Sequence, residues 1–427
     1  MHRFVLQGMA ANREFFSDTN LCYYPYVEPE KGAGSGLLEA LIEDASVMVT
    51  DDFPCFFLPQ MVRKVAKRLP VLAEAVDSNG LLPMRAASKT YPTAYAFRRF
   101  LQKELPNHFD SMPKANPLSR KDLPAAKPIA KAIRTRWPQA SDSLLEASSE
   151  SLAELPIDHE VGPATFVGGH TAASKQLRQF MKNRFDRYAE DRNVPDERVT
   201  SELSPYLHFG HISAHEVFRT VANKEAWSAE KVEGKKTNGK REGWWGMSET
   251  AEGFMDELIT WRELGYNMCW QEKNYDKYKS LPDWARKTLE DHADDVRDPC
   301  YSLAEFESCS THDDLWNAAQ NQLATEGRMH NYMRMVWGKK ILEWSKSPQE
   351  ALRIMTHLNN KYAVDGRNPN SYSGILWCLG RYDRAWGPER PIFGKIRYMS
   401  SDNTKRKFSV KGYLEKYGLN SQPTLFD

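Results

Sequence analysis

Residues 200–213 read TSELSPYLHFGHIS, so the hydroxyl side chains of Thr200, Ser201 and Ser204 stand immediately before a stretch with helical spacing. Backbone N–H groups and the helix dipole make the start of a helix favourable for phosphate. Read alone, these residues are better explained as an ordinary helix cap. Helical character prevails from about residue 172 onward, with helices predicted at residues 174–189, 213–222, 251–269, 315–322, 330–345 and 348–362.

The first hundred residues show a different pattern, in which helical and strand-like periods alternate. Helices are predicted at residues 3–17, 37–45, 59–69 and 94–105, and strands at residues 22–27, 46–50 and 71–76. Such alternation is typical of parallel βαβ units, so we expect a small doubly wound, Rossmann-like sheet. The segment 106–170 is rich in Pro, Ala, Ser and Lys and has weak periodicity. The chain is therefore predicted to consist of an α/β domain (residues 1–110), a connecting segment (111–171) and an all-α domain (172–427).

Composition limits the class of protein. A length of 427 residues exceeds one ordinary core, and a mean hydropathy of −0.64 argues against membrane burial. The 58 basic and 57 acidic residues give a net charge of +1, so a nucleic-acid site would have to be a local basic patch. Six cysteines without CxxC spacing suit a reducing compartment, the cytoplasm. The spacing of His208, His211 and His215 could suit a metal, but HExxH is absent and we expect no metal site.

Several long motifs together resemble the class II branch of the DNA photolyase and cryptochrome family. Besides residues 188–213, they are VTDDFP (49–54), AVDSNGLLP (75–83), FMDELITWRELGYN (254–267), DLWNAAQ (314–320), GRMHNYMRMVWGKKILEW (327–344), LNNKYAVDGRNPN (358–370) and ERPIFGKIRYM (389–399). Motifs in the right order over the whole chain are far more specific than a single pattern. Members of the family usually begin with one more strand and helix. We therefore expect an α/β domain that lacks its first β-α unit, or a start site that is internal.

The resemblance implies an enzyme, a carbon–carbon lyase, that uses light and reduced FAD to split cyclobutane pyrimidine dimers in DNA. Residues that would hold the FAD phosphates and ribityl chain are Tyr188, Thr200, Ser201, Leu203 and Ser204. Arg334 and Asp365 would form a charge pair beside the isoalloxazine ring, and Asn359 would face flavin N5. A capping or surface role is the alternative for each residue.

Three tryptophans resemble the electron-transfer chain of the class II enzymes: Trp337 as the proximal member, Trp316 as the distal one and Trp344 as an auxiliary one. Trp337 and Trp344 are seven residues apart, which places them on one face of a helix. A core stripe of large aromatic rings would have the same spacing. The resemblance favours a path that returns electrons from the surface to an oxidised flavin.

The same resemblance implies a lesion pocket. Trp261 and Trp377 would stack on a dimer flipped out of the duplex, and Met335 would form an apolar wall. Glu257 would hydrogen-bond the pyrimidine edge, a role that suits a carboxyl with a raised pKa. Candidates for contacts with the phosphates of damaged double-stranded DNA are Arg384, Arg390, Lys395 and Arg397. A solvated charged surface is the alternative for each of these four.

Two other functions compete with repair. One is a cryptochrome-like blue-light sensor without repair activity, and the lesion-pocket residues argue against it. The other is a non-enzymatic helical DNA-binding protein, which would leave the serine-rich segment and Asn359 without a role. An antenna chromophore of the deazaflavin type and a monomeric state are further expectations.

Overall fold

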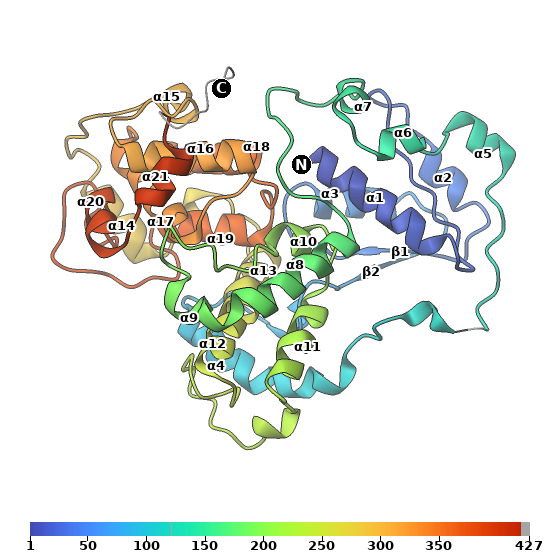
Figure 1. Cartoon of the computed structure of the whole chain (residues 1–427), viewed down its shortest axis with the longest axis horizontal. Helices are drawn as coiled ribbons and strands as arrows, with labels where there is room; N and C mark the ends of the chain where they lie inside the picture. The colour runs from blue at the N-terminus through green and yellow to red at the C-terminus, as the bar shows by residue number, and fades with distance from the viewer. Residues whose placement is uncertain (121, 420–427) are drawn as a thin grey trace.

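The computed structural model describes residues 1–120 and 122–419. Its N-terminal α/β part occupies one side of the molecule, except for its last helix, which lies against the helical part (Figure 1). The elements of this part are α1 (His2–Phe16), α2 (Leu37–Leu41), β1 (Val47–Asp51), α3 (Leu58–Ala66), β2 (Leu72–Val76) and α4 (Ala94–Glu104). These bounds agree closely with the predicted helices and with two of the three predicted strands.

Strands β1 and β2 pair in parallel, with Val47 opposite Leu72 and Asp51 opposite Val76. They form a two-stranded sheet, which is the single sheet among the described residues. Four apolar side chains lie on one exposed face: Val47, Val49, Leu72 and Val76. Parallel sheets are ordinarily covered on both faces, so this small sheet is more open than is usual for its class.

The strand predicted at residues 22–27 is wrong. These residues are extended but lie in no strand. Their hydrogen bonds run to the connecting segment instead, where Ala140 N donates to Pro25 O at 2.9 Å and Tyr24 Oη donates to Trp137 O at 2.5 Å. A strand needs a partner strand, and local sequence cannot show whether that partner is present.

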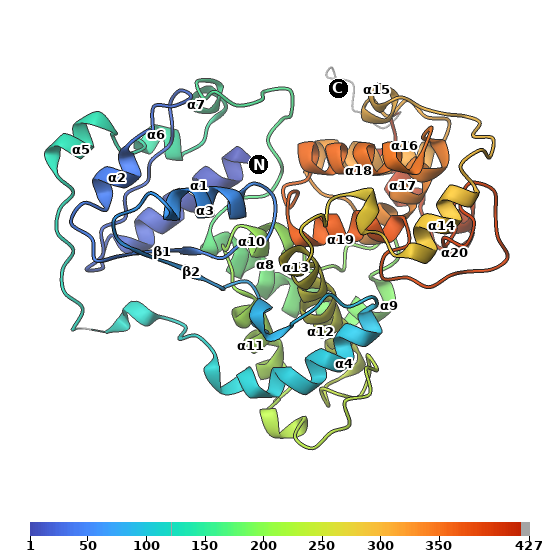
Figure 2. The same cartoon turned by 180° about the vertical axis from the view of Figure 1, so that it is seen from behind.

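The connecting segment leaves α4, runs along the edge of the molecule and returns to the α/β part (Figures 1 and 2). It carries three short helices, α5 (Lys131–Arg136), α6 (Asp142–Leu145) and α7 (Ser149–Ala153). Helix α6 packs on α1, and α5 packs on α2. Leu6 of α1 and Leu145 of α6 belong to a small separate core. The segment is therefore packed onto the first domain and is more than a loose linker.

The rest of the chain is helical, as predicted. Its helices are α8 (His170–Asn183), α9 (Tyr188–Asp191), α10 (Ser204–His208), α11 (Ala214–Lys224), α12 (Glu249–Met255), α13 (Arg262–Gln271), α14 (Asp283–Asp291), α15 (Leu303–Glu307), α16 (Asp314–Glu326), α17 (Asn331–Trp344), α18 (Pro348–Tyr362), α19 (Pro369–Cys378), α20 (Ser401–Lys407) and α21 (Lys411–Tyr417). No described helix is both long and apolar enough to span a membrane.

One large core joins the two parts of the molecule. It contains Phe4 of α1, Leu81 from the loop after β2 and Trp316 of α16. Helix α8 begins against α1 at Gly168 and Gly169, where a Cβ atom at Gly168 would collide with Phe4 O and where Gly169 has φ +96°. Helix α19 packs against both α13 and α17. This central set of helices carries most of the residues predicted to have a function.

Candidate functional site

The hydroxyl-rich segment lies at the centre of the helical part. Thr200 and Ser201 precede α10, Leu203 anchors the turn in the core, and Ser204 is the first residue of the helix. Ser204 Oγ donates a hydrogen bond to Asp365 Oδ2 at 2.5 Å. This contact joins the segment to the loop that follows α18. Two groups predicted to hold one cofactor, 161 residues apart in sequence, are thus brought together.

A cluster of arginines surrounds Glu202 within the same segment. Its carboxylate lies 2.7 Å from both Arg198 and Arg328, and 3.6 Å from Arg184. Burial alone would raise the pKa of Glu202, but the hydrogen bonds from Arg198 and the charges of Arg328 and Arg184 lower it. Arg328 also pairs with Glu326 at 3.0 Å, so three guanidinium groups meet two carboxylates. The cluster keeps an excess of positive charge, which suits phosphate.

Two buried polar atoms beside this segment lack hydrogen-bond partners in the described structure. They are Asn359 Nδ2, near the C-terminus of α18, and Asp365 Oδ1. Leaving such a group unpaired costs about 1–3 kcal/mol. A donor and an acceptor of this kind fit a polar ligand such as FAD. Asp365 Oδ2 accepts from Ser204 and Oδ1 has no partner, so the charge pair with Arg334 that the resemblance implies is not formed among the described residues.

Glu257 lies opposite an arginine that was not among the predicted site residues. Arg192 Nη1 lies 3.0 Å from Glu257 Oε1, and its guanidinium lies 5.4 Å from the ring centroid of buried Tyr188. Burial raises the pKa of Glu257, and the charge of Arg192 opposes that rise without cancelling it. A raised pKa suits the hydrogen-bonding role that the resemblance implies for Glu257. Burial, followed by the nearby Glu257 charge, also raises the pKa of Tyr188.

Glu257 and Trp261 belong to a π-helical turn, η6 (Asp256–Trp261), inserted between α12 and α13. Such insertions are often found at functional sites. Asp256 anchors the turn because its two carboxylate oxygens accept hydrogen bonds from Arg98 of α4 at 2.7 and 3.0 Å. Sequence periodicity predicted one continuous helix here and did not reveal the insertion.

The remaining residues of the predicted lesion pocket lie on helices that pack together. Trp377 is on α19 and Met335 on α17, and α19 contacts both α17 and the helix that follows Trp261. Trp261, Met335 and Trp377 are all partly exposed, although most of their neighbours in sequence are buried. Large side chains that stay partly open in a mostly buried region are suited to contact a ligand.

The three predicted electron-transfer tryptophans form a continuous buried path. Trp316 Nε1 donates to Trp337 O at 3.1 Å, and the rings of Trp316 and Trp344 have centroids 6.1 Å apart. Trp316 therefore lies between the other two. Trp344 also contacts Tyr301 and His312, at 5.7 and 4.9 Å between centroids, and both of these reach the surface. These two residues were not predicted, and their sequence positions carried no signal.

The predicted phosphate-binding residues lie on one segment near the C-terminus, and one of them, Arg397, contacts the Trp377 indole. The guanidinium of Arg397 lies 5.9 Å from the Trp377 ring and 5.0 Å from the Trp386 ring, and Arg384 lies 4.5 Å from Trp386. Two further basic residues are exposed on the same segment: Arg390, over Tyr398, and Lys395, paired with Glu389. Trp386 is thus an aromatic member of this basic group that sequence analysis did not single out.

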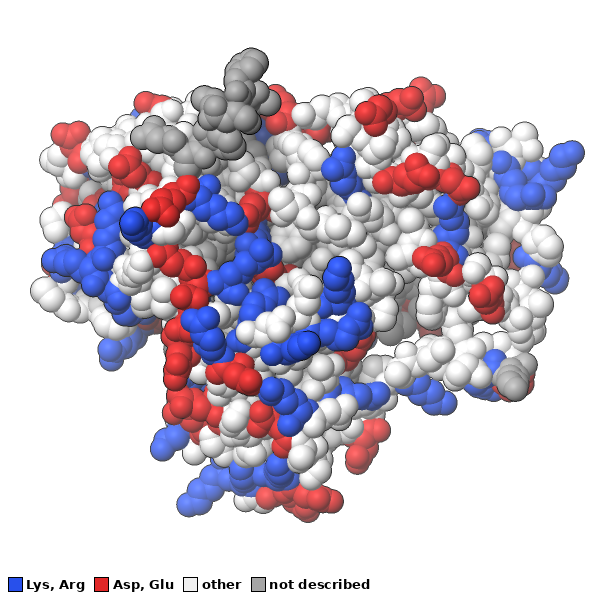
Figure 3. All heavy atoms as spheres, in the orientation of Figure 1, with Lys and Arg blue, Asp and Glu red and all other residues white. Residues whose placement is uncertain are grey.

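A second basic surface crosses the face shown in Figure 3, where Lys and Arg side chains gather over α8 and the adjoining helices. On α8, the exposed cations are Lys175, Arg178 and Lys182. Their spacing of three and four residues places them on one face. A net charge of +1 therefore conceals marked local charge separation.

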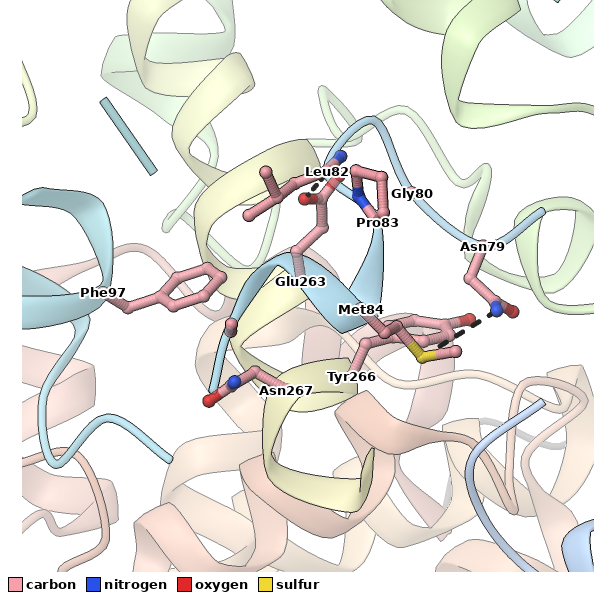
Figure 4. Close-up of a pocket in the computed structure, with 10 residues that line it drawn as sticks. Asn79, Gly80, Leu82, Pro83, Met84, Phe97, Glu263, Tyr266 and Asn267 are labelled. Atoms are coloured by element: carbon pink, nitrogen blue, oxygen red, sulfur yellow. Dashed lines mark hydrogen bonds between the residues drawn. The ribbon is translucent and has the colours of Figure 1, made fainter. Parts of the chain in front are cut away.

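Two hollows lie apart from the predicted site residues. The cavity in Figure 4, of about 10 Å³, has room for little more than one water molecule. In it, Glu263 of α13 accepts hydrogen bonds from Leu81 N at 2.7 Å and Leu82 N at 3.2 Å, which fastens the loop after β2 to the helical part. A groove of about 890 Å³ follows the outer face of α18 and contains none of the predicted site residues. The described residues contain no cluster of His, Cys, Asp and Glu suited to a metal ion.

Comparisons with known proteins identify the family. The chain is 32% identical to the deoxyribodipyrimidine photo-lyase of Methanothermobacter thermautotrophicus, over 97% of this chain and 83% of that protein. It is 38% identical to the deoxyribodipyrimidine photo-lyase of Arabidopsis thaliana, over 96% of this chain and 78% of that one. The deoxyribodipyrimidine photo-lyase of Potorous tridactylus is 34% identical, over 90% of this chain and 67% of that one. No family model matches the chain.

Solved structures support the same fold. A bacterial class III photolyase from Agrobacterium tumefaciens superposes with a TM-score of 0.67 at 16% identity, over 97% of this chain and 77% of that one. A cryptochrome from Synechocystis gives a TM-score of 0.61 at 15% identity, with the same coverage. This likeness confirms the expected combination of an α/β part with a helical part. The identity to named enzymes over nearly the whole sequence places the chain in the deoxyribodipyrimidine photolyase family.

Proposed function

We propose that this protein is a light-driven DNA repair enzyme of the class II branch, which splits cyclobutane pyrimidine dimers. The observation that carries the proposal is the pair of partly exposed indoles, Trp261 and Trp377, on packed helices. They lie in the same part of the molecule as a carboxyl with a raised pKa and a group of exposed cations. Flat aromatic faces substitute for lost base stacking when a damaged pair leaves the duplex.

FAD is the cofactor that these residues suit. Thr200, Ser201 and Ser204 would bind its phosphates, helped by the arginines around Glu202 and by the apolar support of Leu203 and Tyr188. Reduced FAD, when bound, supplies one electron to the dimer under light and takes it back once the two carbon–carbon bonds have opened. The unpartnered atoms of Asn359 and Asp365 would meet the isoalloxazine ring. Arg334 would lie beside the ring and would pair with Asp365 only when the cofactor is bound, since the two make no ion pair in this structure.

In the lesion pocket, the residues of this chain bind and orient the dimer. Trp261 and Trp377 would stack on it, and Met335 would exclude water from its apolar side. Glu257 in its protonated form would donate a hydrogen bond to the pyrimidine edge, and Arg192 holds that carboxyl in place. The DNA phosphates on either side of the lesion would be bound by Arg384, Arg390, Lys395 and Arg397.

The tryptophan path has a separate duty, which is to return the cofactor to its reduced state. Trp337 would be the first donor, followed by Trp316, with Trp344 leading toward the surface. The proposal is supported by the continuous contact from Trp337 through Trp316 to Trp344. Repair by an enzyme that is already reduced does not need this path.

The domain assignment is part of the same proposal. Residues 1–110 form an antenna-type domain, in which β1 and β2 correspond to part of a larger doubly wound sheet, and residues 172–427 bind FAD and DNA. The exposed apolar face of the sheet supports this view. We further propose a deazaflavin-type antenna, a monomeric state and a cytoplasmic location, the last supported by the unpaired cysteines of the described chain.

Absorption spectroscopy on the purified protein tests the proposal. We expect about one FAD per chain, seen as flavin absorption that is released on denaturation, and photobleaching of the oxidised band under blue light. Folded protein that neither carries FAD nor takes it up would rule out the assignment. A cryptochrome-like sensor would bind FAD equally well, but it would not prefer dimer-containing DNA to undamaged DNA.

A further inference from the structure

Lys339 on α17 is an ammonium group buried in the helical core. Its side chain is 0% exposed, and Nζ donates one hydrogen bond, to Cys378 O at 2.7 Å. No carboxylate lies within ion-pair distance of it in the described part of the chain. The neighbouring Lys340, in contrast, is paired with Glu343 at 2.6 Å. Burying a cation without a counter-ion is unfavourable for folding, so this placement does not add to stability.

The ammonium faces the indole of the proposed lesion pocket. Lys339 Nζ lies 4.8 Å from the ring centroid of Trp377. Close packing of α17 against α19 sets this approach, because a Cβ atom at Gly338 would collide with Cys378 Sγ. Trp377 itself remains partly exposed. The Lys339 ammonium is the nearer of two cations at the indole, since the Arg397 guanidinium lies 5.9 Å from the same ring. Part of the ring stays open to a ligand.

A cation behind an aromatic ring has two physical consequences. The attraction between the ammonium and the electron-rich face fixes the plane of the ring, and it is strongest where water is excluded. The positive charge also acts through the ring, because the low-dielectric interior screens it weakly. A base stacked on the open side would then hold an additional electron more easily. The dimer carries such an electron between its arrival and its return, so the overall electron balance of repair is unchanged.

We propose that Lys339 is the positioning residue of the lesion pocket, where its buried ammonium fixes the Trp377 indole and provides the positive field in which the dimer holds its transferred electron. The inference rests on the proposed function, because it takes Trp377 as the indole that stacks on the lesion. It adds a residue that touches neither the cofactor nor the DNA and that acts only through Trp377.

The charge of Lys339 is expected to be sensitive to pH. Burial lowers the pKa of Lys339 to about 8, against the opposing effects of the Cys378 thiol and the Asp383 carboxylate and together with the nearby Arg397 charge. The cation is therefore present below about pH 8 and is lost above it. Burial raises the pKa of Cys378 to about 11, so the thiol stays neutral across this range.

The experiment compares Lys339→Met with Lys340→Met in full-length, FAD-loaded, pre-reduced protein. We expect Lys339→Met to lower repair of a defined dimer per absorbed photon about tenfold. Its preference for dimer DNA over undamaged DNA in the dark should fall, while the melting temperature stays equal or rises. Lys340→Met removes the same charge from the same helix and should leave both repair measurements unchanged. Equal repair by the two variants would overturn the proposal, as would a loss of repair that simply follows a lower melting temperature.

A pH profile on unmodified protein supplies a second measurement if Lys339→Met does not fold. Repair per photon should fall as the pH rises from 7 through 8 to 9, with dimer DNA kept saturating, and a flat profile over that range would overturn the proposal. The proposed function fails separately: if Trp377→Ala leaves dimer binding unchanged, the lesion pocket itself is wrongly assigned. If Trp377→Ala weakens dimer binding as predicted and Lys339→Met has no effect on repair, the inference about Lys339 is rejected and the lesion pocket is retained.

Discussion

Replacing Trp377 by Ala gives the sharpest test of an enzyme against a sensor. If the indole stacks on a flipped dimer, its removal should weaken binding to damaged DNA by about 1–3 kcal/mol, or roughly 5- to 150-fold. Binding to undamaged DNA depends mainly on phosphate contacts and should change much less. Trp261→Ala should behave in the same way, because Trp261 is the second partly exposed indole of the pocket.

The cost to folding should be modest for these two residues. Truncation of a fully buried indole costs about 3–5 kcal/mol of unfolding free energy, but Trp261 and Trp377 are already partly exposed and lose less. Trp316→Ala is the matched control, because Trp316 is 0% exposed and should bear the full cost. That control should lose melting temperature, flavin and both kinds of DNA binding together.

The assay combines melting temperature, FAD occupancy and dark binding to matched duplexes with and without one dimer. We predict that Trp261→Ala and Trp377→Ala keep FAD and fold, and that the ratio of damaged to undamaged affinity falls. If the ratio is unchanged in both variants while the fold is intact, the lesion pocket is misassigned and the sensor interpretation gains support.

Further predictions concern the tryptophan path, the basic residues and the domain junction. Trp337→Phe should block photoreduction of oxidised flavin, measured as the bleaching rate under blue light, but leave repair by pre-reduced enzyme largely intact. Normal bleaching in this variant would show that the three tryptophans only pack the core. Arg384→Gln and Arg390→Gln should weaken damaged and undamaged DNA binding alike and each reduce the slope of log affinity against log salt by about 1; an unchanged slope would remove them from the interface. Burial raises the pKa of Glu263 to about 7 from 4.5, so its contribution to stability is full below about pH 4.5 and is lost as the pH rises through 7. The unfolding free energy of the unmodified protein should therefore fall relative to Glu263→Gln between pH 5 and 8, by at most about 3 kcal/mol, and parallel pH curves would contradict this assignment.

Local sequence predicted elements well where the determining forces are local. Helix α18 was predicted at residues 348–362 and is found at Pro348–Tyr362, because Ser347 caps its first turn and Pro348 can occupy only the start of a helix. The prediction of a strand at residues 22–27 was wrong because a strand depends on a distant partner strand. The π-helical turn at Asp256–Trp261 was not predicted, because one inserted residue hardly changes the apolar periodicity of the sequence.

The candidate site likewise contains features that the sequence predicted and features that it did not. The resemblance supplied the residues and their roles, but it did not supply every contact among them. Arg192 lies opposite Glu257 across 65 residues of sequence, and Lys339 reaches Trp377 from another helix. Pairings of this kind depend on helix packing, which no spacing rule encodes. The order from Trp337 through Trp316 to Trp344 was implied by the resemblance, and the contacts between α16 and α17 show how these residues touch.

The central claim is light-driven repair of one kind of lesion. The direct measurement is the loss of cyclobutane dimers and of (6-4) photoproducts from defined duplexes incubated with pre-reduced protein, in blue light and in the dark. The class II resemblance of the pocket predicts that cyclobutane dimers disappear only in the light and that (6-4) photoproducts remain. Turnover of (6-4) DNA with none of the cyclobutane dimer, or no light-dependent loss by protein that retains reduced FAD, would contradict the account.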